Sequence, residues 1–174
     1  MVEQLLGADD DWQEPVAGYL YPKLHQYLVW LGGLIGVPLY AIGGTGSSQY
    51  VGKVDIDEET LEHEFADLGL LRNPITAYKI KADGREQEGS WVLWHDYDSR
   101  GLVEPGRQLH IMIFERADEQ PGREIYAHYE DDWRSAPIAH LREKNFDVEQ
   151  GVEKATDLFD DWSFITLKDS TTKD

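Results

Sequence analysis

The fold is decided by three segments in the middle of the chain, Ser90-Trp-Val-Leu-Trp-His-Asp96, Gln108-Leu-His-Ile-Met-Ile-Phe-Glu115 and Glu124-Ile-Tyr-Ala-His-Tyr-Glu130. Each is rich in aromatic and β-branched residues, a composition typical of β-strands. The connecting residues, 97–107 and 116–123, are polar and contain Gly or Pro, as turns do. The simplest topology for consecutive strands with such connections is a meander of antiparallel hairpins.

Outward from this meander, further strands and helices are predicted on both sides. Residues 37–42, 50–56 and 75–81 have strand-like patterns, and helices are expected over 15–31, from Asp57 to about residue 70, from Ser135 to residue 141 and after Asp147. The predicted class is therefore α+β: an antiparallel sheet of about six strands packed with three or more α-helices. The length suits a single domain, 1–174, in which 1–12 and 168–174 are expected to be frayed tails.

The charge of the chain is its most unusual property. Asp and Glu number 34 against 16 Lys and Arg, so the formal net charge is −18. Such self-repulsion destabilises a compact state in dilute buffer, but at molar salt the Debye length falls to about 3 Å and the repulsion is largely screened. The composition therefore predicts a protein of a high-salt cytoplasm. An ordinary acidic protein and an acidic interaction protein that mimics nucleic acid are the alternatives, and direct nucleic-acid binding is not expected because no basic patch exists.

Two further compositional features limit the possible functions. The chain has no Cys, which excludes disulfides, thiolate catalysis and Cys-based zinc sites. The apolar stretch 27–44 contains several Gly and a Pro, and it falls short of the roughly 20 apolar residues of a transmembrane helix. We therefore expect this stretch to be core rather than a membrane anchor. Acidic residues near the N-terminus, where a signal peptide is basic, argue against secretion.

The histidines of the three central strands are the candidate functional residues. If one face of the sheet must be apolar, Trp94 pairs with Ile111 and Val92 with Ile113, while His110 pairs with Glu130 and Met112 with His128. For the preceding hairpin, Ile80 is expected opposite Val92 and Tyr78 opposite Trp94. Together these registers place aromatic side chains, imidazoles and a carboxylate on the opposite face. The predicted members of that face are Lys79, Lys81, Trp91, Leu93, His95, His110, Met112, Phe114, Tyr126, His128 and Glu130.

Three interpretations of this mixed face remain open. It can be covered by other elements and serve only the fold. It can be a groove for a small molecule or a protein partner, with the ligand-binding residues Trp91, His95, His110, Phe114, Tyr126 and His128. It can also hold a divalent metal ion through His95, His110, His128 and Glu130, which suits a metal-dependent hydrolase-type enzyme.

Overall fold

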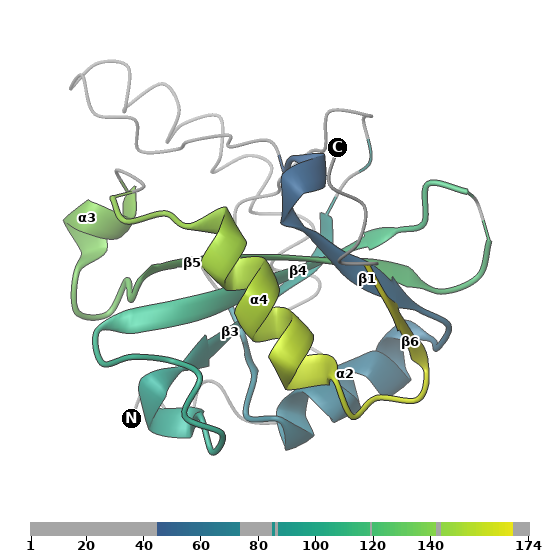
Figure 1. Ribbon diagram of the computed structural model, residues 1–174, viewed down its shortest axis with the longest axis horizontal. Helices are drawn as coiled ribbons and strands as arrows, with labels where there is room; N and C mark the ends of the chain where they lie inside the picture. The colour runs from purple at the N-terminus through teal and green to yellow at the C-terminus, as the bar shows by residue number, and fades with distance from the viewer. Residues whose placement is uncertain (1–44, 74–84, 86, 119, 142–143, 169–174) are drawn as a thin grey trace, which may run out of the picture.

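A computed structural model describes residues 45–73, 85, 87–118, 120–141 and 144–168 of the chain. Its centre is a six-stranded antiparallel sheet with the strand order β2-β3-β4-β5-β1-β6 (Figure 1). Within the described ranges three α-helices accompany the sheet, so the arrangement is α+β as predicted. The elements are β1 Tyr50–Val54, α2 Glu58–Asp67, β2 Leu71–Arg72, β3 Gln87–Trp94, β4 Arg107–Glu115, β5 Arg123–Asp131, α3 Pro137–Leu141, α4 Val148–Phe159 and β6 Ile165–Leu167, with short 3-10 turns η2 Ser47–Gln49 and η3 His95–Tyr97.

The predicted meander is present as β3, β4 and β5. The free side of β5 then pairs with β1, and β6 pairs with the other side of β1. Neither β2 nor β6 was predicted, because segments this short carry no readable periodicity. The expected strands at 37–42 and 75–81, the expected helix at 15–31 and the tail 1–12 lie outside the described residues.

Helix α2 begins at the predicted cap but ends earlier than predicted. The Asp57 carboxylate accepts a hydrogen bond from the Thr60 backbone N–H at 2.9 Å. Gly69 adopts φ 82°, and the Leu70 N–H donates to the Phe65 carbonyl at 2.9 Å. This is a Schellman ending, in which a glycine in the left-handed region stops the helix. The helix therefore ends at Asp67 rather than near residue 70.

Helix α4 lies directly against the backbone of β5. Asp147 caps it, as predicted, by accepting from the Gln150 N–H at 2.9 Å. At Gly151 a Cβ atom would lie 2.2 Å from the Cα of His128, so only glycine permits this close approach. The chain after α4 returns to the sheet as β6, and the Lys168 N–H donates to the Val51 carbonyl at 2.7 Å. Lys168, which was predicted to belong to a frayed tail, is thus hydrogen-bonded to the sheet. The other residues of that predicted tail, 169–174, lie outside the described part.

The main hydrophobic core lies between one face of the sheet and helices α2 and α4, which cover that face together (Figure 1). Phe65 of α2 is fully buried. The centroid of its ring lies 5.1 Å from the ring centroid of Trp91, 5.8 Å from that of Phe159 and 5.9 Å from that of Trp162. The buried members of this main core are Val51, Val54, Leu61, Phe65, Leu70, Trp91, Leu93, Val103, Leu109, Ile111, Ile113, Ile125, Ala127, Tyr129, Ala155, Leu158 and Phe159.

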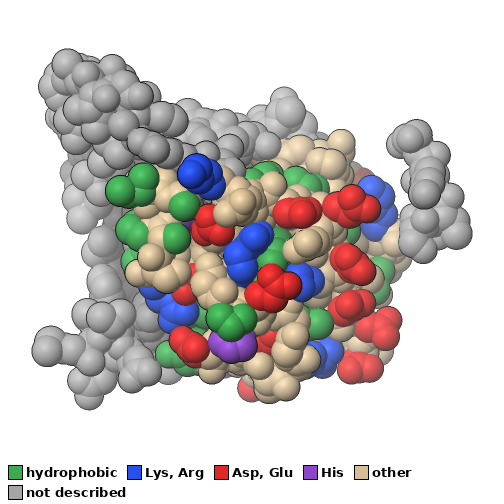
Figure 2. Space-filling view, turned by 60° about the vertical axis from the view of Figure 1, so that its left-hand side comes forward, with side chains coloured by type: hydrophobic (Ala, Val, Ile, Leu, Met, Phe, Trp, Pro, Cys, Tyr) green, Lys and Arg blue, Asp and Glu red, His purple; other side chains and the backbone are tan. Residues whose placement is uncertain are grey.

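Acidic side chains lie over much of the visible surface, among Lys and Arg in its middle and as a run along its right-hand side (Figure 2). Several of the basic side chains pair with carboxylates: Arg116 lies 2.6 Å from Asp55 and 2.7 Å from Asp118. Within the described part of the chain, no helix has both the length and the apolar character needed to cross a bilayer, and the stretch 27–44 is outside that part.

Candidate functional site

The register of β3 against β4 differs from the predicted one. Trp91 lies opposite Ile111 and Val92 opposite His110, whereas the prediction placed Trp94 opposite Ile111. This is a displacement of three residues, and an odd displacement exchanges the two faces of a strand. Trp91 and Leu93 consequently belong to the main core. Trp91 was therefore wrongly assigned to the histidine face.

The register of β4 against β5 is also displaced, but by an even number of residues. His110 lies opposite His128, where the prediction placed Glu130. A displacement of two residues preserves the faces, so Met112, Phe114, Tyr126, His128 and Glu130 do share the face of His110 as predicted. Next to the histidines, Met112, Phe114 and Tyr126 form a second buried cluster together with Tyr50.

His95 does not join the other histidines. Strand β3 ends at Trp94, and His95 starts the 3-10 turn η3 that leads away from the sheet. Its Nδ1 lies 2.7 Å from the carbonyl oxygen of Val103, a core residue of the following loop. The prediction that His95 contributes to a ligand or metal site on this face is therefore wrong.

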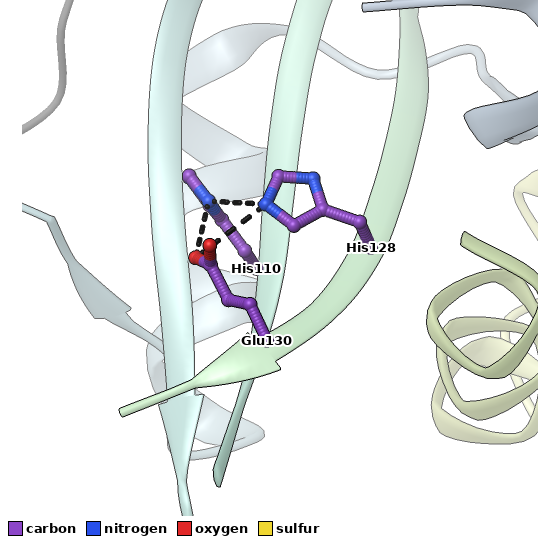
Figure 3. Close-up of side chains that lie close together, drawn as sticks. All are labelled: His110, His128 and Glu130. Atoms are coloured by element: carbon purple, nitrogen blue, oxygen red, sulfur yellow. Dashed lines mark hydrogen bonds and ion pairs between the residues drawn. The ribbon is translucent and has the colours of Figure 1, made fainter. Parts of the chain in front are cut away.

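The remaining three predicted metal ligands converge on one point (Figure 3). His110 Nδ1 lies 3.0 Å from His128 Nε2 and 3.0 Å from Glu130 Oε1, and His128 Nε2 lies 3.4 Å from the same carboxylate oxygen. All three residues are buried, with exposed fractions of 4%, 0% and 5%. Neighbouring strands β4 and β5 supply all three side chains, so the site is built on the most regular part of the sheet.

Each converging group also has a polar partner outside the trio, on the far ring nitrogen of each histidine and on Oε1 of Glu130. Ser90 Oγ lies 2.5 Å from His110 Nε2, and Gln49 Oε1 lies 3.1 Å from His128 Nδ1. The amide of Gln108 donates to Glu130 Oε1 at 2.8 Å and accepts from Trp94 Nε1 at 2.9 Å. The orientation of both imidazoles and of the carboxylate is thus fixed by the surrounding structure.

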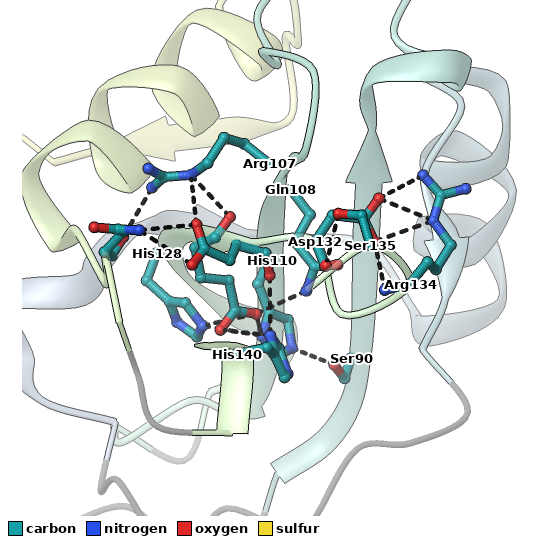
Figure 4. A network of polar contacts seen from close by, with 12 residues as sticks. Ser90, Arg107, Gln108, His110, His128, Asp132, Arg134, Ser135 and His140 are labelled. Atoms are coloured by element: carbon teal, nitrogen blue, oxygen red, sulfur yellow. Dashed lines mark hydrogen bonds and ion pairs between the residues drawn. The ribbon is translucent and has the colours of Figure 1, made fainter. Parts of the chain in front are cut away.

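His140 is a fourth neighbour that the sequence did not single out. Its Nδ1 lies 3.3 Å from Glu130 Oε2 and 3.1 Å from the Asp131 carbonyl oxygen (Figure 4). Ser90, Gln49 and Gln108 were missed as well. The correct β3 register would have shown that Ser90 shares the face of His110, since Val92 lies opposite that histidine. For His140 and Gln49 no local pattern exists, because their positions depend on how α3 and η2 pack.

The carboxyl of Glu130 is ionised over the neutral pH range. Burial raises its pKa, but the charge of His128 and hydrogen bonds from His110 and His128 outweigh burial and hold the pKa well below its usual value. The contribution of this carboxylate to stability is therefore full above about pH 4.3, the ordinary pKa of Glu, and is lost as the pH falls through the lowered pKa of the folded state.

This arrangement offers two imidazole nitrogens and a carboxylate oxygen, a donor set that suits zinc and neighbouring divalent transition metals. The same side chains also connect Ser90, His110 and Glu130 in the order of a nucleophilic relay, since the hydroxyl lies by Nε2 and the carboxylate by Nδ1. The comparisons with known proteins add no family, because no protein-family model, no curated protein and no solved structure matches this chain.

Proposed function

We propose that this protein binds one divalent transition-metal ion, zinc or a close neighbour of zinc, between His110, His128 and Glu130. The observation that carries the proposal is the spacing of the three donor atoms, 3.0, 3.0 and 3.4 Å. Zinc bonds of about 2.0–2.1 Å at tetrahedral angles separate the donor atoms by about 3.3 Å. An ion between these atoms would therefore require only small movements of the side chains.

The polar partners on the outward side support the same proposal. A histidine that binds a metal through one ring nitrogen usually donates its other N–H to an oxygen, which fixes the tautomer and the ring orientation. Ser90 Oγ and Gln49 Oε1 stand at the required positions beside His110 Nε2 and His128 Nδ1. Glu130 brings one negative charge, which offsets part of the charge of a buried divalent ion.

A serine-dependent hydrolase is a second candidate, favoured by the contacts that join Ser90, His110 and Glu130. The two candidates exclude each other, because a metal ion on His110 Nδ1 displaces the hydrogen bond from this nitrogen to Glu130. The relay also requires the hydroxyl to meet its substrate, and Ser90 is only 3% exposed. We favour the metal centre for this reason.

The broader functions expected from the sequence remain proposals beside the metal centre. A small molecule or protein partner that uses Phe114 and Tyr126 on the same face would first have to uncover these two buried side chains. A metal-dependent hydrolase-type reaction requires, in addition, a position on the ion that is open to water. The number of protein ligands therefore decides between a binding and a hydrolytic role.

Metal binding is tested by dialysing the protein against Zn²⁺, Co²⁺, Ni²⁺ and Mn²⁺ in separate high-salt buffers and measuring metal content and thermal unfolding. We expect one bound equivalent of at least one metal. A free ion at 100 times its Kd stabilises the folded state by about 2.7 kcal/mol, which raises the Tm of a chain of this size by about 5–11 °C. His110→Gln should abolish this metal-induced rise.

The matched control is His63→Ala, since His63 is an exposed residue of α2. This variant should keep the full rise in Tm and the single bound ion. Absence of any bound metal in the unmodified protein, with no change in Tm for all four ions, would contradict the proposal. The relay predicts that negative result, because its carboxylate stays bonded to His110.

We also propose that the acidic surface adapts the protein to a high-salt cytoplasm. The net charge is −18, and carboxylates lie over much of the face in view in Figure 2. Screening should therefore stabilise the whole molecule rather than one site. We expect the Tm to rise between dilute buffer and 2 M KCl, with most of the gain below about 1 M, where the Debye length has fallen to about 3 Å. An unchanged or lower Tm in KCl would contradict this interpretation.

A further inference from the structure

Helix α3 is positioned by a tight turn at the end of β5. The backbone N–H groups of Ser135 and Ala136 donate to the Asp132 carbonyl at 3.1 and 2.8 Å, and the Asp132 carboxylate accepts from the Arg134 backbone N–H at 2.9 Å and from its guanidinium at 2.8 Å. The turn folds the chain back on itself, so that α3 places His140 beside the end of the strand that carries Glu130 (Figure 4).

The carboxylate of Glu130 is shared between two sides of the site. Oε1 faces His110 and His128, while Oε2 lies 3.3 Å from Nδ1 of His140. Three imidazoles therefore surround one carboxylate. Among the described residues, the donor atoms that all lie within 4.8 Å of one another are those of His110, His128 and Glu130, so His140 has to move from Oε2 toward an ion to join them.

The environment of His140 differs from that of the other three residues. The side chain of His140 is 22% exposed, against 5% for His110, 0% for His128 and 6% for Glu130. The torsion that turns a histidine ring is broad and roughly two-fold, so a partly exposed ring reorients at little cost. His140 can consequently exchange its contact with the Asp131 carbonyl for a bond to an ion without disturbing the packed core.

We infer that His140 is the fourth protein ligand, so that the ion is held by three histidines and one glutamate. This inference rests on the proposed metal centre and makes it more specific. A tetrahedral zinc ion with four protein ligands has no open position for water, which is the arrangement of structural rather than catalytic sites. The protein is then a metal-stabilised binding domain and not a metal-dependent hydrolase.

The number of imidazole ligands is the direct test, measured by X-ray absorption spectroscopy on the zinc-loaded protein. We expect three imidazoles in the unmodified protein and two in His140→Ala. Loss of a residue that merely supports a ligand typically weakens metal binding by about 10–100-fold, so loss of a direct ligand should weaken it by about 100-fold or more. Added imidazole should restore binding to His140→Gly by filling the vacated position.

Two comparisons separate the possible outcomes. In the Co²⁺-loaded proteins, azide should change the visible spectrum of His140→Ala, which has an open position, and leave the unmodified protein unchanged. The matched control is His95→Ala, because His95 is exposed and its ring contacts the Val103 carbonyl oxygen instead of the site. This variant should behave as the unmodified protein.

Two imidazoles in the unmodified protein would overturn the inference and leave the metal centre standing, whereas absence of any bound metal would overturn both. A weaker affinity with an unchanged imidazole count would likewise overturn it, because His140 would then act only through Glu130.

Discussion

Phe65→Ala should lower the free energy of unfolding by about 3–5 kcal/mol, the usual cost of removing a buried phenylalanine ring. The ring is fully buried and packs against Trp91 of the sheet, Phe159 of α4 and Trp162 beyond it. These large neighbours belong to three different segments and cannot collapse together into the space. The expected fall in Tm is about 6–20 °C, at about 2–4 °C for each kcal/mol in a chain of this size. Urea unfolding in high salt measures the loss directly.

The control for this substitution is His63→Ala, two positions away on the exposed side of the same helix. We expect it to change stability by no more than about 0.5 kcal/mol. Because the aromatic core lies on the face of the sheet opposite the histidines, Phe65→Ala should also leave the metal affinity of the folded protein unchanged. A loss below about 1 kcal/mol would mean that this aromatic core is not packed as described.

Gly151→Ala should destabilise the protein by about 3 kcal/mol, although alanine is the better helix former by about 1 kcal/mol. The new methyl group would lie 2.2 and 2.4 Å from the Cα and carbonyl carbon of His128 and 2.6 Å from the Tyr129 nitrogen. These are backbone atoms of a central strand, so helix α4 has to move instead. The movement also strains the backbone of His128, and we therefore expect weaker metal binding in this variant.

Glu153→Ala, at an exposed position of the same helix, is the control for this effect. It should change stability by only a few tenths of a kcal/mol and leave metal binding intact. Thermal unfolding with and without zinc gives both quantities for each variant. A stabilised Gly151→Ala protein would show that α4 does not touch β5 at this point.

The parts of the fold that were predicted correctly are those with strong local signals. The patterns of residues 108–115 and 124–130 predicted β4 and β5 to within one residue, and the two Asp caps predicted where α2 and α4 begin. The sequence predicted that α2 ends too late, near residue 70, because Asn73-Pro74 was expected to end the helix. The helix instead ends before Gly69, which adopts a left-handed conformation. Strands β2 and β6 are two and three residues long, and pairing with neighbours rather than their own composition defines them.

The candidate site was predicted only in part, for a reason that lies in β3. Trp91 and Leu93 on one side of this strand and Val92 and Trp94 on the other are all large, apolar and buried. Hydrophobic alternation cannot fix a register when both faces are apolar. The predicted register of β4 against β5 was displaced by two residues, which leaves each side chain on the correct face, so His110, His128 and Glu130 were identified. The predicted register of β3 was displaced by three residues, which put Trp91 on the wrong face.

The sequence positions of the proposed ligands bear on how the chain assembles. His110, His128, Glu130 and His140 follow one another within the hairpin of β4 and β5 and the helix after it, whereas β1 joins the sheet through distant pairs such as Tyr50 with Tyr126 and Gly52 with Leu167. Closing the short hairpin loop costs less chain entropy than closing the long ones, so this hairpin is expected to form early. A metal ion can therefore bind a nascent hairpin and hold it while the non-local strands arrive, which makes the ion an aid to folding as well as a component of the folded state.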